Sequence, residues 1–127
     1  MDKHLNFIKT NEDAINPVSN REIARIDLFS PKDYIIPPNE SILVATGINF
    51  LLPSSYYPRV TYPFYNPFKI IVLWGGILKD TGDIGITLHN LSNDKEIIIK
   101  KGDKIAHVIF EHFLDVTEIS EITDHSR

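Results

Sequence analysis

Two titratable side chains stand inside otherwise apolar stretches of this 127-residue chain, Asp27 and His107. A carboxylate or an imidazole beside a bound molecule can exchange protons with it or form hydrogen bonds to it. Each residue also has a purely structural interpretation. Asp27 could close the end of a strand, and His107 could be a packed histidine whose hydrogen bonds are satisfied. Both interpretations stay open on the residues alone.

Several other kinds of chemistry are excluded by residue type and spacing. The five histidines, at positions 4, 89, 107, 112 and 125, show no metal-ligand spacing, and His107 and His112 point to opposite faces of a strand. The pair Gly75-Gly76 lacks the Gly-Lys-Ser/Thr of a phosphate loop and predicts a bend or a close backbone approach. The chain has no cysteine, which excludes disulfides and thiolate chemistry.

Length and charge limit the class of protein. The chain fits one domain, residues 1–127, large enough for a core without disulfides or metal. A net charge of −4 argues against nucleic acid as a partner. The longest apolar runs have the length of a strand, so no membrane span is expected. We therefore expect an intracellular protein, cytoplasmic or nuclear.

The elements that must position Asp27 and His107 are strands. Gly102-Asp103 predicts a tight turn, and the residues after it, through Glu111, predict a strand with apolar side chains on both faces. Such a strand suggests a core on one face and a subunit interface on the other. Ile26 to Phe29 predicts a second strand, and Ser41 to Phe50 alternates as one half-buried strand.

The rest of the chain is also strand-like. Strand-sized pieces alternate with Pro, Gly and Asn turns, and no window predicts a long amphipathic helix, which indicates an antiparallel barrel or jelly roll. Residues 1–20 are predicted to be a loosely held N-terminal arm, although Leu5, Phe7 and Ile8 could instead form a short docked strand. Residues 114–127 are predicted to be a C-terminal tail.

Two stretches resemble motifs of a known family. Residues 102–109 resemble G-D-R-I-A-Q-L-I, and residues 24–30 resemble A-G-Y-D-L-Y-S, both of the trimeric dUTPases. Further pieces between them follow the order and spacing of that family, so the resemblance covers roughly residues 24 to 111. It implies an all-β, dUTPase-like distorted jelly-roll barrel that assembles as a homotrimer.

The resemblance also implies a chemistry. The family splits dUTP into dUMP and pyrophosphate, with magnesium on the triphosphate, at sites shared between three subunits. Asp27 stands at the aspartate that helps to hold the water shell of the metal, so no residue is expected to ligate the metal directly. His107 stands at a glutamine near the phosphates. Arg59, Lys79 and Lys104 are candidates for binding the nucleotide.

The chain departs from the family at three other motifs. Where the family has P-R-S-G, the aligned residues are Tyr62-Pro63-Phe64-Tyr65. At the aspartate that orients the attacking water, the chain has Ile77 or, with a two-residue gap, Lys79, so the carboxylate is missing unless Asp80 replaces it. The glycine-rich closing motif is absent.

An aromatic-rich segment lies where these motifs are lost. Seven of the thirteen aromatic residues fall between Tyr56 and Trp74. They either fill volume left by nucleotide and helix, or form an apolar patch for a protein partner. The partner-binding candidates are Tyr62, Phe64, Tyr65, Phe68 and Trp74.

These departures favour a non-catalytic binding or regulatory protein that has lost dUTP hydrolysis, as in accessory proteins of DNA viruses. It would need no cofactor. The alternative is a divergent, magnesium-dependent dUTP pyrophosphatase with a rearranged site of Asp27, Asp80 and His107. A third possibility, a nucleotide-binding regulator related in fold to dCTP deaminases, is opposed by the missing closing motif.

Overall fold

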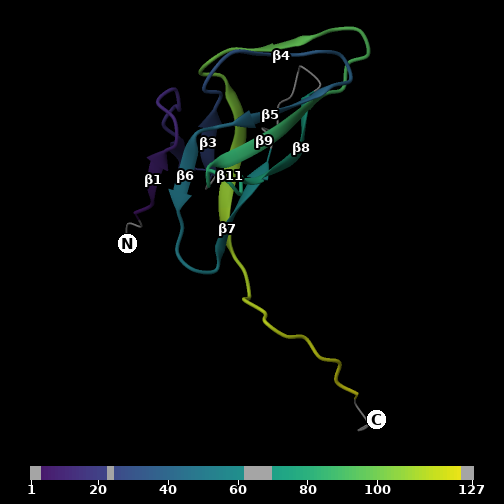
Figure 1. Cartoon of the computed structure of the whole chain (residues 1–127). Helices are drawn as coiled ribbons and strands as arrows, with labels where there is room; N and C mark the ends of the chain where they lie inside the picture. Colours follow the sequence, from purple (N-terminus) through teal and green to yellow (C-terminus); the bar gives the residue numbers. More distant parts are fainter. Residues whose placement is uncertain (1–3, 23–24, 62–69, 124–127) are drawn as a thin grey trace.

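The computed structural model describes residues 4–22, 25–61 and 70–123, which form eleven strands and no helix (Figure 1). Among these residues, no helix is long and apolar enough to cross a membrane. The strands are β1 (Asn6–Lys9), β2 (Val18–Asn20), β3 (Arg25–Phe29), β4 (Tyr34–Ile36), β5 (Ser41–Ala45), β6 (Ile48–Leu51), β7 (Tyr56–Thr61), β8 (Ile70–Ile77), β9 (Ile84–Asn90), β10 (Ile97–Ile99) and β11 (Lys104–His112).

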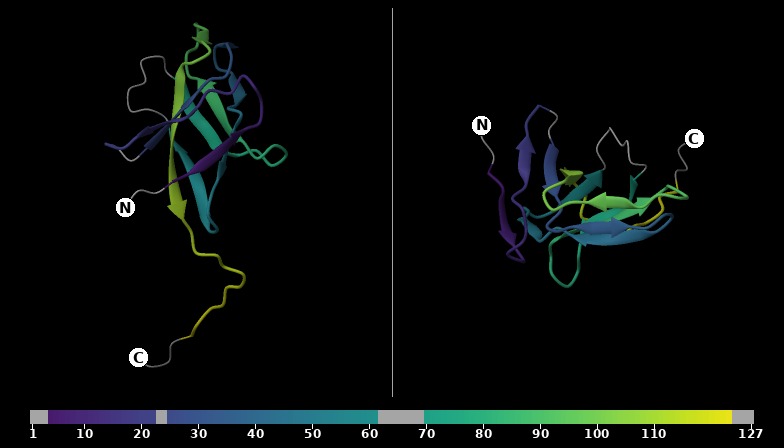
Figure 2. Two further views of the ribbon diagram at one scale, coloured as in Figure 1. Left: turned by 90° about the vertical axis from the view of Figure 1, so that its left-hand side faces the viewer. Right: turned by 90° about the horizontal axis from the view of Figure 1, so that it is seen from above.

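Two larger sheets make up the body of the molecule. One has the order β2-β3-β11-β7 and the other β5-β9-β8, and all their pairings are antiparallel. Two further pairs, β1 with β6 and β10 with β4, complete the described part of the chain. Figure 2 shows the two larger sheets lying against each other. The expected all-β jelly-roll fold is confirmed.

The core lies between these two sheets because each strand turns every second side chain inward. Leu28 and Val108 come from the first sheet, and Val44, Ile86 and Leu88 from the second. All five are fully buried. Burying a branched aliphatic side chain stabilises the fold by about 1.5–3 kcal/mol, so this apolar interior is the main source of stability.

The central strand β11 is buried on both faces within a single chain. Ile105, Ala106, His107 and Val108 are 3%, 0%, 4% and 0% exposed. The sequence suggested a subunit interface on the second face of this strand. This half of β11 needs no partner subunit, because side chains of the chain itself cover it, Asp27 among them.

The stretch predicted as one strand, Ser41 to Phe50, is broken at Thr46-Gly47 into β5 and β6. Gly47 has φ +74°, a conformation that side chains other than glycine rarely adopt. The break directs β5 to β9 and β6 to β1. Residues 6–9, for which an arm and a docked strand were both open, therefore pair with the body.

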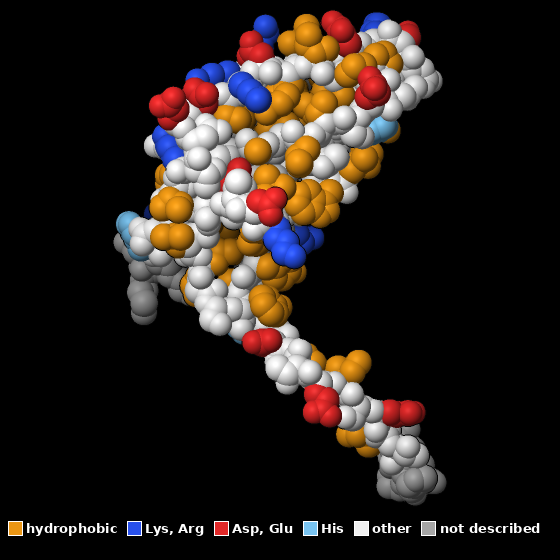
Figure 3. Space-filling model, viewed as in Figure 1, with side chains coloured by type: hydrophobic (Ala, Val, Ile, Leu, Met, Phe, Trp, Pro, Cys, Tyr) orange, Lys and Arg blue, Asp and Glu red, His pale blue; other side chains and the backbone are white. Residues whose placement is uncertain are grey.

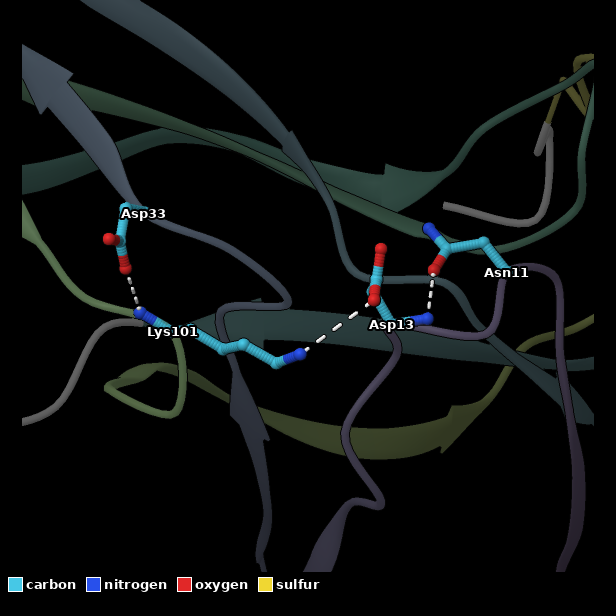
Figure 4. A network of polar contacts seen from close by, with 4 residues as sticks. All are labelled: Asn11, Asp13, Asp33 and Lys101. Atoms are coloured by element: carbon cyan, nitrogen blue, oxygen red, sulfur yellow. Dashed lines mark hydrogen bonds and ion pairs between the residues drawn. The ribbon is translucent and has the colours of Figure 1, made fainter.

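A polar network holds the N-terminal segment near the turn before β11 (Figure 4). The backbone N–H of Lys101 donates to Asp33 Oδ1 at 2.8 Å, and its Nζ lies 3.7 Å from Asp13 Oδ1. Asn11 Oδ1 in turn accepts from the backbone N–H of Asp13 at 2.7 Å. Three segments distant in sequence thus meet at one surface site.

Beyond β11 the chain leaves the body as an extended tail (Figure 1). Leu114, Ile119 and Ile122 are 84–88% exposed. Acidic and apolar side chains alternate along it in Figure 3. The tail contributes little to the core of its own chain.

A close approach of the two sheets at Gly75 yields a stability prediction. A Cβ at Gly75 would overlap all three side-chain carbons of Val60, whereas one at Gly76 would lie 3.1 Å from the movable Trp74 ring. We expect Gly75→Ala to lower the free energy of unfolding by about 1–3 kcal/mol, and Gly76→Ala by less. Urea denaturation measures both. Val60→Gly removes all three overlapping carbons, so it should cost less stability in the Gly75→Ala background than in the wild type; equal costs would contradict this packing.

Candidate functional site

A polar face lies on the outer side of the sheet β3-β11-β7. His107 is paired with Asp27 on one neighbouring strand and with Thr61 on the other. Residues directly opposite each other in an antiparallel sheet project to the same side, so these three form one row. The polar face, as the term is used below, consists of Asp27, Arg59, Thr61, Lys104, His107 and Glu111.

The centre of the polar face is the Asp27–His107 pair. Asp27 Oδ1 lies 2.8 Å from His107 Nδ1, and the two residues are 9% and 4% exposed. An ionised carboxylate only accepts hydrogen bonds, so Nδ1 is the donor and carries the proton. Lys104 Nζ lies 3.9 Å from the other carboxylate oxygen, Oδ2. Both oxygens of Asp27 are thus engaged by neighbouring side chains.

This arrangement bears on metal binding. The resemblance gave Asp27 a role in the water shell of a metal, yet both its oxygens face cationic or hydrogen-bond-donating groups of the chain. Within the described ranges, no group of three or more histidines and carboxylates could hold a metal ion. The described residues therefore do not fit a resident metal.

The remainder of the polar face lies on β7 and the end of β11. Arg59 Nε and Glu111 Oε1 form an ion pair whose side chains are 56% and 37% exposed, so it contributes no more than about 1 kcal/mol. Thr61 Oγ1 is different. It is buried and has no hydrogen-bond partner. A buried hydroxyl without a partner costs free energy in the folded protein.

The other two candidates, Lys79 and Asp80, lie elsewhere in the subunit. They belong to the exposed turn between β8 and β9, in the other large sheet. Asp83, only 2% exposed, holds this turn by accepting from the backbone N–H of Gly47 at 2.9 Å and from the hydroxyl of Thr81. In the described part of one chain, no hydrogen bond or ion pair joins this turn to the polar face.

Four of the five partner-binding candidates, Tyr62, Phe64, Tyr65 and Phe68, lie outside the described residues. The fifth, Trp74, is 46% exposed on β8, opposite Thr87. Tyr56 packs near His112, with ring centroids 5.0 Å apart, and Tyr57 near Phe113, 6.0 Å apart. The described aromatic residues of this segment, Tyr56, Tyr57 and Trp74, therefore form separate contacts.

Sequence reasoning did not find Thr61 and Glu111. Their spacing in the sequence could have indicated them: Thr61 lies two residues after Arg59, and Glu111 lies four residues after His107. Residues at these spacings share a face of a strand. Only the pairing of β7 with β11, however, places Arg59 and Thr61 next to His107 and Glu111.

Comparison with known proteins gives sequence relatives over nearly the whole chain. The dUTPase family profile matches residues 11–127. The chain is 33% identical to the deoxyuridine 5'-triphosphate nucleotidohydrolase of Mus musculus, covering 97% of this chain and 79% of that protein. The enzyme of the same name from Paramecium bursaria Chlorella virus 1 is 34% identical, with 94% and 88% covered. For the one from Rattus norvegicus, at 33% identity, the chain spans 64% of the relative.

Solved structures give the same fold. A point mutant of the dUTPase from phage phi11 of S. aureus has a TM-score of 0.83, with 98% of this chain and all of the other covered. A point mutant of the phage 80alpha dUTPase has a TM-score of 0.82, with 99% of this chain and all of the other covered. Both are 18% identical in sequence, so they establish the architecture alone.

The unpartnered hydroxyl of Thr61 gives a second stability prediction. Thr61→Val removes a buried oxygen that has no partner, so we expect the melting temperature to stay the same or rise. Thr46→Val is the matched control, because Thr46 Oγ1 donates to the carbonyl of Ile84 at 2.7 Å in a fully buried position. It should lose about 1–3 kcal/mol of stability. Equal losses in the two variants would mean that Thr61 is hydrogen-bonded.

Proposed function

The chain belongs to the dUTPase family, and on that premise we propose that it hydrolyses dUTP to dUMP and pyrophosphate. One observation carries the proposal: the fold brings Asp27 and His107, from motifs 80 residues apart, into one polar row beside Lys104. The relatives named as deoxyuridine 5'-triphosphate nucleotidohydrolases, at 33–34% identity over nearly the whole chain, support the same activity.

The cations of the polar face would bind the phosphates. The Lys104 side chain is 42% exposed and that of Arg59 56% exposed, so both can reach a bound anion without losing all hydration. Phosphoryl transfer gains most from positive charge placed where negative charge develops. Magnesium would arrive as the complex with the triphosphate and thus as part of the substrate.

A second candidate is the non-catalytic binding protein that the sequence departures favour. The observation that supports it in the structure is the exposure of Trp74, 46%, in the aromatic-rich segment. Trp and Tyr carry much of the binding energy at protein interfaces. The comparisons favour the hydrolase, since the relatives that match nearly the whole chain are named for hydrolysis. A measurement of dUTP hydrolysis distinguishes the hydrolase from the non-catalytic binding protein.

We also propose the homotrimer that the resemblance implies. The outer side of the sheet β5-β9-β8 exposes Leu43, Ile71 and Trp74, with exposed fractions of 52%, 36% and 46%. Leu43 and Trp74 both lie opposite Thr87, and Ile71 opposite His89, so they share one side of the sheet. An apolar sheet face of this kind is suited to contact between subunits.

The hydrolase proposal predicts that the purified chain releases pyrophosphate from Mg-dUTP. We expect Lys104→Met to raise KM for dUTP about tenfold, because one charge-assisted phosphate contact is worth roughly 1.5 kcal/mol. Lys101→Met is the matched control, because Lys101 pairs with Asp13 outside the polar face. A coupled pyrophosphate assay measures both. Wild-type protein that releases none would leave the binding protein as the function.

The trimer proposal predicts a particle three times the 14.5 kDa mass of the chain. Sedimentation equilibrium measures this mass. Trp74 is the only tryptophan, so its fluorescence should shift to the blue on association. Leu43→Lys should shift the equilibrium towards monomer, whereas Val18→Lys, a similarly exposed position on β2, should not. A monomeric wild-type chain at every concentration would contradict the proposal.

A further inference from the structure

The Asp27–His107 pair has the geometry of an oriented base. A carboxylate that accepts from one imidazole nitrogen fixes the ring orientation and its tautomer, and leaves the other nitrogen unprotonated. Here Asp27 Oδ1 accepts from His107 Nδ1 at 2.8 Å, so the lone pair is on Nε2. Because β3 and β11 are paired at these two residues, the backbone holds the arrangement rigidly.

The other ring nitrogen, Nε2, belongs to the polar face, because His107 projects to that side of the sheet. Across the described residues, the one hydrogen bond found for the His107 ring is that of Nδ1, and the side chain is 5% exposed. Thr61 lies directly opposite His107, so its unpartnered hydroxyl is on the same side.

We propose that His107 is the general base of the hydrolysis, oriented by Asp27. This inference rests on the proposed function and names the group that takes the proton. The base then stands at the position where the dUTPase family has glutamine. It replaces the aspartate that orients the attacking water in that family, which has no counterpart at Ile77 or Lys79 in this chain. Asp27 then acts as a positioning residue rather than in the water shell of a metal.

The step balances in atoms and charge. The oxygen of a water molecule attacks the α-phosphorus of dUTP while one of its protons passes to His107 Nε2. The bond between the α-phosphorus and the oxygen bridging to the β-phosphate breaks, and that oxygen leaves with pyrophosphate. The products are dUMP, pyrophosphate and an imidazolium, which Asp27 stabilises until the proton is lost to solvent.

The acidic groups of the polar face are less available than His107 to act as the base. Both oxygens of Asp27 are engaged, and Glu111 is paired with Arg59. Asp80 is exposed in the β8–β9 turn, in the other large sheet. It is the competing assignment, because a neighbouring subunit of a trimer can supply it. The charged groups that share this side of the sheet with His107 are Arg25, Asp27, Arg59, Lys104 and Glu111.

The first test compares turnover in His107→Gln and Asp80→Asn. Loss of a general base lowers kcat by on the order of 10²–10⁴, and we expect this for His107→Gln with little change in KM. His112→Gln is the control, because His112 packs on Tyr56 away from the row. Asp27→Asn should also lower kcat, because it removes the charge that orients the imidazole.

The outcomes separate the two proposals. If pyrophosphate release persists in His107→Gln but is lost in Asp80→Asn, His107 is not the general base. The proposal that the chain hydrolyses dUTP is then still supported. No release by wild-type protein overturns both.

A second test determines which ring nitrogen of His107 is protonated, without measuring hydrolysis. Long-range ¹H–¹⁵N spectra of the wild type at pH 8 should show Nδ1 protonated and Nε2 unprotonated. A non-hydrolysable dUTP analogue with Mg²⁺ should shift Nε2. In Asp27→Asn the two tautomers should mix. A protonated Nε2 in the wild type overturns the assignment.

Discussion

The pairing of β11 along both its edges is the constraint on which this structure depends. β3 and β7 flank it, so residues from three distant parts of the chain share one sheet. The two-residue period of a strand then divides their side chains between two faces. Leu28, Ala106 and Val108 enter the core, while Asp27 and His107 turn to the opposite face. The core and the polar face are thus the two sides of one sheet, and the same strand register determines which residues lie on each side.

A carboxylate that is 9% exposed is stable there only with partners. An unpaired buried charge costs several kcal/mol, whereas a charge with short hydrogen bonds on its oxygens recovers most of that cost. Asp27 has His107 on one oxygen and Lys104 near the other. The same contacts that make the aspartate tolerable in the fold also orient the imidazole, so stability and chemistry depend on one interaction.

The second large sheet has a different role. Its inner side completes the core with Val44, Ile86 and Leu88, and Gly75 lets it approach Val60 closely. Its outer side exposes apolar residues, including Trp74, and its β8–β9 turn carries Lys79 and Asp80 away from the polar face. The proposed trimer gives both features a use: a contact surface, and a turn that could reach a site on another subunit.

The sequence by itself determined the fold class, the family and most strand positions. Alternating apolar residues predicted the strands around Ile86 and Val108, and two motifs with a fixed order predicted the dUTPase-like barrel. It did not reveal the break at Gly47, because the apolar alternation continues on both sides of it. Only the tertiary structure decided that Thr61 stands beside His107, and that Lys79 and Asp80 do not. Contacts such as Asp27 to His107 join residues 80 positions apart, and strand register, which local patterns do not encode, brings them together.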